Sequence, residues 1–128
     1  MRILGVDYGR KKIGLALAST RIAEPFKVIR YRDYEEAIEK LRQVVQVEKV
    51  EKFVLGISEG KMAEETRKFA RRIEEKLKIP IVFQDETLTT RRSQELSIEA
   101  GIKRKKRKAL EDAYSATLIL QSFLDSIM

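Results

Sequence analysis

The sequence of 128 residues contains no cysteine, no histidine and no tryptophan. The absence of cysteine excludes disulfides, thiolate metal sites and thiol nucleophiles. The absence of histidine removes the commonest general base and a frequent zinc ligand. Any chemistry must therefore depend on carboxylates, hydroxyls, amines or a metal ion held by oxygen atoms.

Long apolar runs and a secretory signal pattern are also missing. No stretch approaches the roughly 20 apolar residues that span a bilayer. The start, "MRILGVDYG", lacks the separate basic region, apolar core and small-residue cleavage site of a signal peptide. We therefore expect a cytoplasmic protein with no membrane partner. At this length we expect one domain, residues 1–128, and not two lobes that close on a ligand.

Positive charge is in excess, with 27 Lys and Arg against 20 Asp and Glu and a formal net charge of +7. This excess favours a polyanionic partner, most simply nucleic acid, although a basic chain can merely be soluble. Six basic residues are consecutive: Lys103, Arg104, Lys105, Lys106, Arg107 and Lys108. They could contact phosphates, form a solvated segment or act as a nuclear-localisation signal. Their position just before Asp112 favours substrate binding.

The hydrophobic pattern predicts an α/β fold. Short apolar or alternating runs over residues 2–8, 13–18, 26–31, 52–57 and 81–84 predict five strands. Helical spacing predicts four helices, over residues 34–48, from 62 to before 80, over 90–100 and from about 110 to 126. The first begins with a capping box at Asp33 and Glu36, and Pro80 ends the second. A meander of three strands followed by alternating strands and helices implies a mixed sheet with helices on its faces.

Acidic residues follow the strands that should run parallel. Their carboxyl ends share one edge of the sheet, where α/β folds usually place their sites. Asp7 ends the first strand, Ser58 and Glu59 follow the fourth, and Asp85 and Glu86 follow the fifth. Glu59 is more simply a solvated loop residue. Asp7 follows an unbroken apolar run, so we interpret it as functional, although a structural, hydrogen-bonded aspartate would also explain it.

Asp112 is the second acidic residue with an unusual position. Ala116, Ile119 and Phe123 lie four, seven and eleven residues after it, so its carboxylate should lie on the apolar face of the last helix. The helix dipole explains an acid at Glu111, but not an inward Asp112. Carboxylates without histidine or cysteine suit Mg²⁺ or Mn²⁺, and a metal pair can hydrolyse a phosphodiester. The pattern thus predicts a nuclease.

Four motifs, "ILGVDYGRKKIGLAL", "VLGI", "DETLTT" and "EDAYSATLILQSFLD", together resemble the YqgF/RuvX family over nearly the whole chain. The resemblance implies a ribonuclease H-like fold with a five-stranded mixed sheet in the order 3-2-1-4-5, flanked by helices. It also implies a metal-dependent nuclease that processes the 5′ end of pre-16S ribosomal RNA, with Holliday junction resolution as the older proposal. By this resemblance the catalytic and metal-binding acids are Asp7, Glu86 and Asp112.

The sequence departs from the family pattern in two places. The usual Gly-Leu-Pro followed by Asp-Gly is "GISEGK" here, and the usual Asp-Glu-Arg is "DET", so Thr87 replaces an arginine. Both changes affect residues that could touch the substrate and leave the three acids intact. In the first motif, Arg10, Lys11 and Lys12 are predicted to attract phosphate. Gly14 leaves room for the close approach of a backbone or a phosphate.

Two other functional classes compete with the nuclease prediction. The motif "DYGRKKIG" also resembles the phosphate loop of actin-like ATPases and sugar kinases, which hold nucleotide between two such domains. A non-catalytic ribosome-assembly module that binds nucleic acid through its basic residues is the other alternative. The sequence does not distinguish an RNA from a DNA substrate, or an endonuclease from an exonuclease. The oligomeric state, monomer or homodimer, also stays open, since symmetric cutting of a junction needs two active sites.

Overall fold

The computed structural model describes residues 1–85 and 104–127, and the side-chain surroundings of 1–85 and 111–127. The predicted helix over 90–100 and the predicted site residues Glu86 and Lys103 lie outside the described residues. The described strands are β1 (Ile3–Asp7), β2 (Lys12–Ala18), β3 (Glu24–Arg30), β4 (Lys52–Ile57) and β5 (Ile81–Asp85). The described helices are α1 (Tyr34–Glu48), α2 (Lys61–Leu77) and α4 (Arg104–Ser126).

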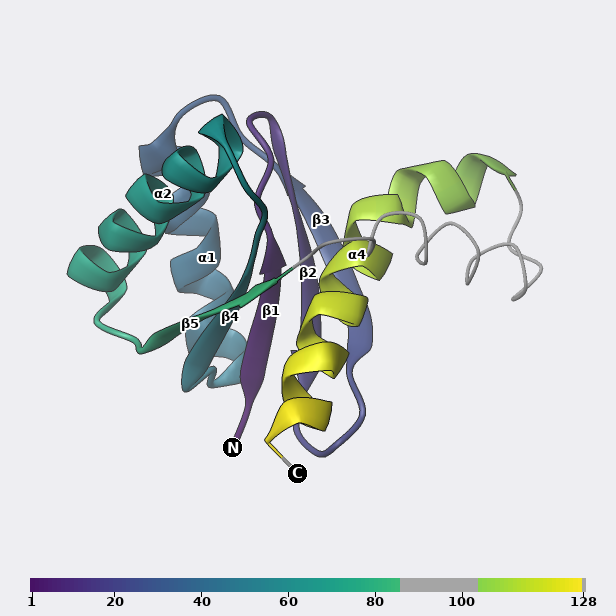
Figure 1. Cartoon of the computed structure of the whole chain (residues 1–128). Helices are drawn as coiled ribbons and strands as arrows, with labels where there is room; N and C mark the ends of the chain where they lie inside the picture. The colour runs from purple at the N-terminus through teal and green to yellow at the C-terminus, as the bar shows by residue number, and fades with distance from the viewer. Residues whose placement is uncertain (86–103, 128) are drawn as a thin grey trace.

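The five strands form one mixed sheet in the order β3-β2-β1-β4-β5, as predicted. β2 pairs antiparallel with β1 and β3, whereas β4 pairs parallel with β1 and β5. Helices α1 and α2 cover one face of the sheet and α4 crosses the other, as Figure 1 shows. The carboxyl ends of β1, β4 and β5 therefore lie at the same edge.

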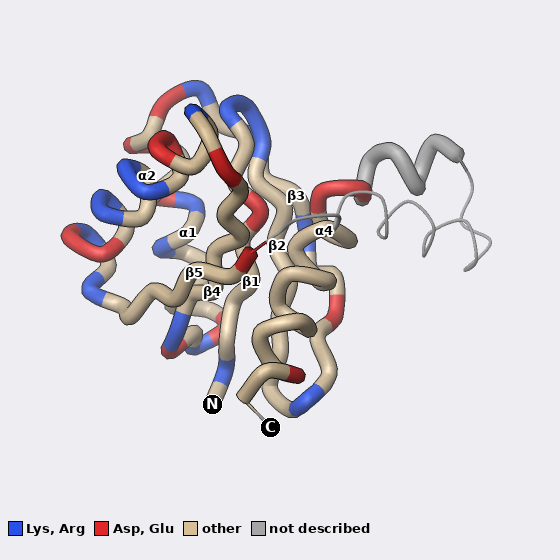
Figure 2. Tube along the Cα trace, in the orientation of Figure 1, with Lys and Arg blue, Asp and Glu red and all other residues tan. Residues whose placement is uncertain are grey.

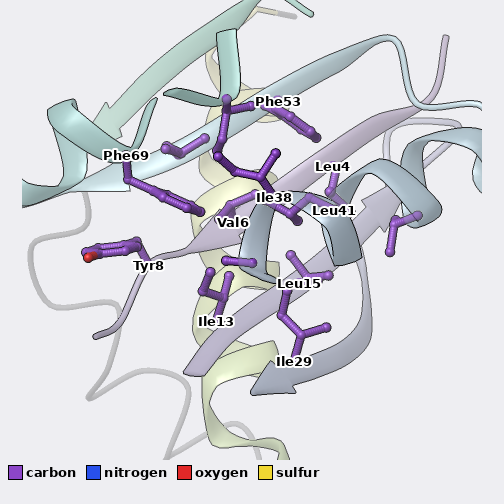
Figure 3. Close-up of a cluster of buried hydrophobic side chains, with 14 of the residues drawn as sticks. Leu4, Val6, Tyr8, Ile13, Leu15, Ile29, Ile38, Leu41, Phe53 and Phe69 are labelled. Atoms are coloured by element: carbon purple, nitrogen blue, oxygen red, sulfur yellow. The ribbon is translucent and has the colours of Figure 1, made fainter. Parts of the chain in front are cut away.

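The larger core lies between the sheet and the pair α1 and α2. Alternate residues of the strands face it, among them Leu4 and Val6 of β1 (Figure 3). The helices contribute Ile38 and Leu41 from α1 and Phe69 from α2. Complete burial of one such side chain stabilises the fold by about 1.5–3 kcal/mol. This packing makes β1, and so the position of Asp7 at its end, rigid.

The smaller core lies under α4 and is built from small residues on the sheet side. Ala16 and Ala18 of β2 pack with Ile119 and Leu120 of α4. A Cβ atom on Gly5 would lie 2.8 Å from the Cβ of Leu120 and 2.9 Å from the carbonyl oxygen of Ala116. Since real Cβ contacts are not that short, α4 lies closer to β1 than any residue larger than glycine would allow.

The start of α1 confirms the predicted capping residue. The side chain of Asp33 accepts a hydrogen bond of 2.9 Å from the backbone N–H of Glu36. The Glu36 carboxylate, however, accepts from the backbone N–H of Arg32 at 2.7 Å. The two acids thus satisfy N–H donors at the helix N-terminus, as a capping box does. In a standard capping box Glu36 would bond the N–H of Asp33, whereas here it bonds the N–H of Arg32, the residue before the N-cap.

The start of α4 differs from the prediction. The helix begins at Arg104 and not near residue 110, so residues 104–108 of the basic run belong to its first turns. Lysine and arginine are good helix formers, and no glycine or proline separates this run from Asp112. Within residues 1–85 and 104–127, no helix is long and apolar enough to cross a membrane.

Candidate active site

Asp7 is the last residue of β1 and is partly buried. Side chains alternate along a strand, so Asp7 shares the face of Ile3, which packs in the core under α4. Opposite Asp7 on the neighbouring strand is Gly14. The carboxylate of Asp7 therefore extends from the end of a rigid strand on the face that α4 covers.

Asp112 lies directly over Gly14. A Cβ atom built on Gly14 would be 2.0 Å from the carbonyl oxygen of Asp112 and 2.8 Å from its Cβ atom. Because Gly14 is the ladder partner of Asp7, with Cα atoms of such a pair about 4.5–5.5 Å apart, the fold brings the two acids to the same place. The close approach predicted at Gly14 is that of the α4 backbone.

The predicted orientation of the last helix is also confirmed. Ala116 and Ile119 are completely buried and Phe123 is nearly so, while Asp112 is partly buried on the same side of α4. Glu111, its neighbour, is partly buried as well. The inward side of α4 thus carries a carboxylate at the level where Gly14 lies beneath it.

Lys12, which is predicted to attract phosphate, forms an ion pair with Asp112. Its Nζ atom lies 3.1 Å from Oδ2 of Asp112, and the two side chains are 43% and 28% exposed. A lysine at the start of β2 therefore neutralises one of the two acids. This pair could not be predicted from the sequence, because the two residues are distant in the chain.

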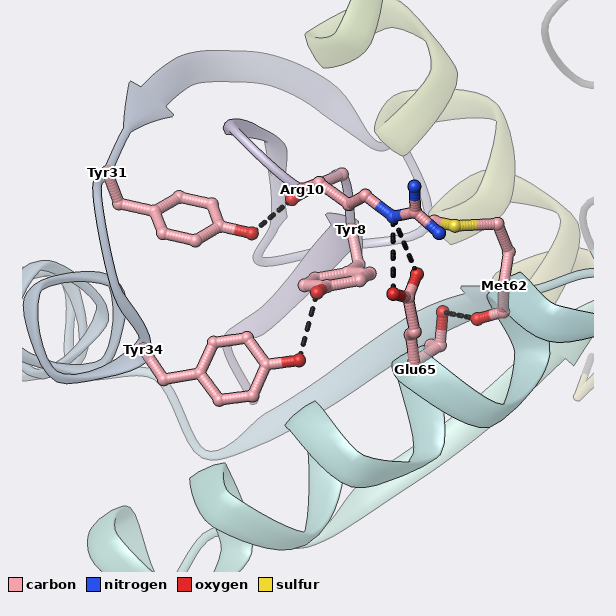
Figure 4. A network of polar contacts seen from close by, with 8 residues as sticks. Tyr8, Arg10, Tyr31, Tyr34, Met62 and Glu65 are labelled. Atoms are coloured by element: carbon pink, nitrogen blue, oxygen red, sulfur yellow. Dashed lines mark hydrogen bonds and ion pairs between the residues drawn. The ribbon is translucent and has the colours of Figure 1, made fainter.

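Three tyrosines fix the turn that follows Asp7 (Figure 4). The hydroxyls of Tyr8 and Tyr34 are hydrogen-bonded at 3.0 Å. The hydroxyl of Tyr31 donates to the carbonyl oxygen of Gly9, and its backbone N–H donates to Lys11. Sequence reasoning missed these residues. The only available signal was a tyrosine directly after the candidate acid, in "DYG".

Burial keeps Tyr8 and Tyr31 protonated. Desolvation, and then the hydrogen bond to Tyr34, raise the pKa of Tyr8 far above the ordinary value. Desolvation also raises the pKa of Tyr31. The ring of Tyr8 packs against Phe69, with ring centroids 4.8 Å apart. Tyr8 and Tyr31 therefore act as neutral hydrogen-bonding groups that support the turn, and not as nucleophiles.

The two other basic residues of the turn differ in their surroundings. Arg10 forms an ion pair of 3.0 Å with Glu65 of α2, and the hydrogen bond to this carboxylate raises the pKa of Arg10. Lys11 is exposed. Figure 2 shows blue segments at this turn and along α1 and α2, whereas the part of α4 that it draws in colour is mostly uncharged. Basic charge thus borders the edge that carries Asp7.

The remaining predicted residues are spread along this edge. Ser58 is partly buried and Glu59 is exposed after β4, in agreement with the solvated interpretation of Glu59. Asp85 is exposed at the end of β5. The basic residues Arg104, Lys105, Lys106, Arg107 and Lys108 lie in the first turns of α4, and their side chains lie outside the described residues. Among the described residues, the fold thus brings together Asp7, Asp112 and Lys12.

The donor chemistry fits a hard divalent cation. Asp7 and Asp112 offer carboxylate oxygens, and the chain has no histidine or cysteine that would favour a softer metal. In residues 1–85 and 104–127, no three acidic residues form a group that could enclose an ion. Mg²⁺ does not need such a group, because it commonly binds to one or two carboxylates, waters and substrate phosphates.

Comparisons with known proteins agree with this geometry. Residues 1–126 match the family model RuvX, described as Holliday junction resolvase. A protein of Caldanaerobacter subterraneus subsp. tengcongensis is 40% identical over 98% of this chain and 97% of its own length. A protein of Syntrophus aciditrophicus is 38% identical over 99% of this chain and 90% of its own length. Both are named "Putative pre-16S rRNA nuclease".

Solved structures show the same fold at low identity. The RuvC protein of T. thermophilus in complex with Holliday junction substrate matches with a TM-score of 0.67 and 14% identity, over 100% of this chain and 96% of its own. The fowlpox virus resolvase, bound to Holliday junction DNA, also gives 0.67, with 13% identity over 100% and 99% of the two chains. The chain therefore belongs to the RuvX family of nucleases, with a ribonuclease H-like fold.

Proposed function

We propose that this protein is a metal-dependent nuclease that acts on structured nucleic acid and processes the 5′ end of pre-16S ribosomal RNA. The observation that carries the proposal is the position of Asp112 over Gly14, the residue paired with Asp7. Two acidic residues from opposite ends of the sequence are thus brought to one sheet edge, in a chain with a net charge of +7. We infer the RNA substrate from the names of the relatives, and a cytoplasmic location from that substrate.

Asp7 and Asp112 would hold Mg²⁺ or Mn²⁺, with Glu86 as a further ligand or a group that orients water. When bound, such ions supply an activated water and stabilise the leaving oxygen of the phosphodiester. The chain itself contributes the fixed position of Asp7 at the end of a buried strand. It also holds the Asp112 carboxylate on α4, since any movement of this turn towards the sheet would collide with β2.

The basic residues of the β1–β2 turn would hold the substrate. Lys11 is exposed and faces solvent beside the proposed site. Lys12 neutralises Asp112 and lies where a phosphate group would approach the two acids. The basic run of residues 103–108 precedes Asp112 in sequence and would extend this positive border. Attraction of this kind weakens with salt, because each phosphate contact releases counterions.

The proposal is tested with three substrates: a structured pre-16S RNA fragment, a four-way DNA junction and single strands, each with Mg²⁺ or Mn²⁺. We expect the wild type to cut the RNA fragment, and Asp7→Asn and Asp112→Asn to lower the rate by roughly 100-fold or more, as loss of a metal ligand does. Glu59→Gln is the matched control, because this acid is exposed at the same edge. Equal cleavage by wild type and Asp7→Asn would contradict the proposal.

Holliday junction resolution is the second candidate, and the description of the matching family favours it. A resolvase would cut the four-way junction in preference to the RNA fragment and would do so symmetrically, with two active sites. Tight, salt-sensitive binding of RNA without cleavage in either metal would instead indicate the non-catalytic assembly module. The same three substrates therefore separate all three functions.

A further inference from the structure

Phe83 is an exposed aromatic residue near the proposed site. It lies on β5, the outermost strand on that side of the sheet, and 42% of its surface is accessible. Its neighbours Val82 and Gln84 face α4, where Gln84 donates a hydrogen bond of 3.0 Å to Ser122. Phe83 therefore points to the opposite face, towards α2, two residues before the strand end at Asp85.

A small cavity of about 150 Å³ lies between α2 and β5 beside Phe83. Its apolar lining is formed by Phe83, Ile81 and Ala70. Arg67 and Arg71 of α2 also line it, one helical turn apart and both exposed. Neither arginine has an ion pair with another residue that the structure describes. Glu74, which is also exposed, completes the lining. An exposed ring thus lies beside two guanidinium groups and one carboxylate, and positive charge is in excess at this cavity.

This combination suits an unpaired nucleotide. Aromatic side chains stack on nucleic acid bases without regard to sequence, and arginine binds phosphate through paired N–H donors. A peptide strand could also pair with the free edge of β5, but two arginines favour a polyanion over a peptide. We propose that Phe83, Arg67 and Arg71 bind an unpaired nucleotide, with its base stacked on Phe83 and its phosphates at the arginines.

The position of Phe83 gives this subsite a role. β5 ends at the same sheet edge as β1, with β4 between them, and Phe83 lies two residues from that edge on the other face of the sheet. The cavity extends from Phe83 towards the start of β5 at Ile81. A strand that continues beyond the cut would pass around β5 and reach Phe83. The inference rests on the proposed function in requiring a nucleic acid substrate, and it adds that this substrate has an unpaired base flanking the cut.

The absence of tryptophan from the chain makes a direct test feasible. In Phe83→Trp the new indole is the sole tryptophan, and stacking on a base should quench its fluorescence. The probe is a single-stranded oligonucleotide of about ten nucleotides, within the usual site size, added in EDTA to an Asp7→Asn background. We expect quenching by this strand and not by a blunt duplex. Val47→Trp, 74% exposed on α1, should not respond.

Two further variants measure the contribution to affinity. Phe83→Ala should weaken binding of the single strand about fivefold to tenfold, at the lower end of the range for base stacking on an aromatic residue. Arg67→Gln combined with Arg71→Gln should lower the slope of log affinity against log salt by about 1.4, or about 0.7 for each phosphate contact. The matched control, Arg21→Gln with Lys27→Gln, removes two exposed charges elsewhere and should leave the slope unchanged.

The outcomes distinguish this inference from the proposed nuclease function. Absence of quenching at position 83, or equal quenching at positions 83 and 47, overturns the inference whatever the cleavage assay shows. Unchanged affinity of Phe83→Ala overturns it as well. Quenching limited to position 83 supports it even if no metal-dependent cleavage is found, because binding is measured without metal. Far-UV circular dichroism verifies that each variant is folded.

Discussion

Nζ of Lys12 lies 3.1 Å from Oδ2 of Asp112, so the first residue of β2 and the helix above it are joined by an ion pair. Gly14, two residues further along β2, touches the backbone of the same aspartate. The contact with Gly14 holds the backbone of Asp112 against the sheet, and the ion pair with Lys12 holds its carboxylate. They also give Lys12 two successive partners in the proposed reaction, a carboxylate in the free protein and a phosphate in the complex.

Replacement of Lys12 should open Asp112 to a cation. We expect Lys12→Met to strengthen the binding of Mn²⁺ alone by about twofold to fivefold, because partly exposed ion pairs contribute up to about 1 kcal/mol. Isothermal titration calorimetry without nucleic acid measures the affinity. Lys11→Met is the control, since Lys11 is exposed and has no ion pair with a described residue. Unchanged or weaker binding in Lys12→Met would contradict this role.

Gly14→Ala should displace α4 from the sheet. The new Cβ atom would lie 2.0 Å from the backbone of Asp112, and a backbone atom cannot rotate away. We expect a loss of about 3 kcal/mol in the free energy of unfolding, the upper range for overpacked cores, together with loss of cleavage. Gly5→Ala is the comparison, because its new Cβ atom would have longer contacts, 2.8 Å to the Cβ of Leu120 and 2.9 Å to the carbonyl oxygen of Ala116. Urea denaturation should show the smaller loss for Gly5→Ala.

Tyr8 should make stability depend on alkaline pH. Its pKa is raised in the folded protein, so folding favours the neutral phenol. This contribution is complete below the unfolded value of about 10 and decreases as the pH rises above it. Tyr8→Phe removes the hydrogen bond to Tyr34, so its free energy of unfolding at pH 7 should be about 1 kcal/mol lower than that of the wild type. Above pH 10 the stability of this variant should fall less steeply than that of the wild type.

Urea denaturation between pH 7 and 11 measures both effects. Tyr114→Phe serves as the control, since Tyr114 has no hydrogen bond to another described residue. Tyr31 also has a raised pKa and continues to titrate in the Tyr8 variant, so some loss of stability at high pH should persist. Parallel pH profiles of wild type and Tyr8→Phe would contradict the assignment.

Asp33→Ala should weaken the start of α1. It removes the hydrogen bond of 2.9 Å to the N–H of Glu36 and should cost about 1 kcal/mol of the free energy of unfolding. Asp33→Asn should cost little, because asparagine caps helices equally well. The helix begins at Tyr34, which is hydrogen-bonded to Tyr8 beside Asp7, so Asp33→Ala should also lower the cleavage rate. Asp33→Asn keeps the cap and should cleave substrate at the wild-type rate. A loss of activity in Asp33→Asn would contradict this expectation.

The strands and the inward side of Asp112 could be predicted because each depends on local periodicity, whereas the strand order 3-2-1-4-5 came from the family resemblance. Alternating apolar residues defined the strands, and the spacing from Asp112 to Ile119 defined the inward side of the last helix. The start of α4 could not be placed, since a run of lysine and arginine is compatible with both helix and loop. Only the packed structure decides between the two.

The contacts that complete the site were beyond sequence reasoning. The pair of Lys12 and Asp112, and the tyrosines around Gly9, join segments far apart in the chain. The strand containing Phe83 was predicted, but the sequence does not reveal that α2 leaves one side of this ring uncovered. The role of Asp7, Glu86 and Asp112 as metal ligands stays a prediction that the cleavage assay tests.

The packing of α4 on β1 and β2 also sets the order of events during synthesis. A ribosome that has produced β1 to β5 has already made Asp7, but the helix that carries Asp112 is still to come. Until α4 docks, Gly5, Gly14 and the alanines of β2 form an open apolar trough. The proposed site is therefore incomplete in the emerging polypeptide, and the docking of α4 completes it at the same time as it buries the second core.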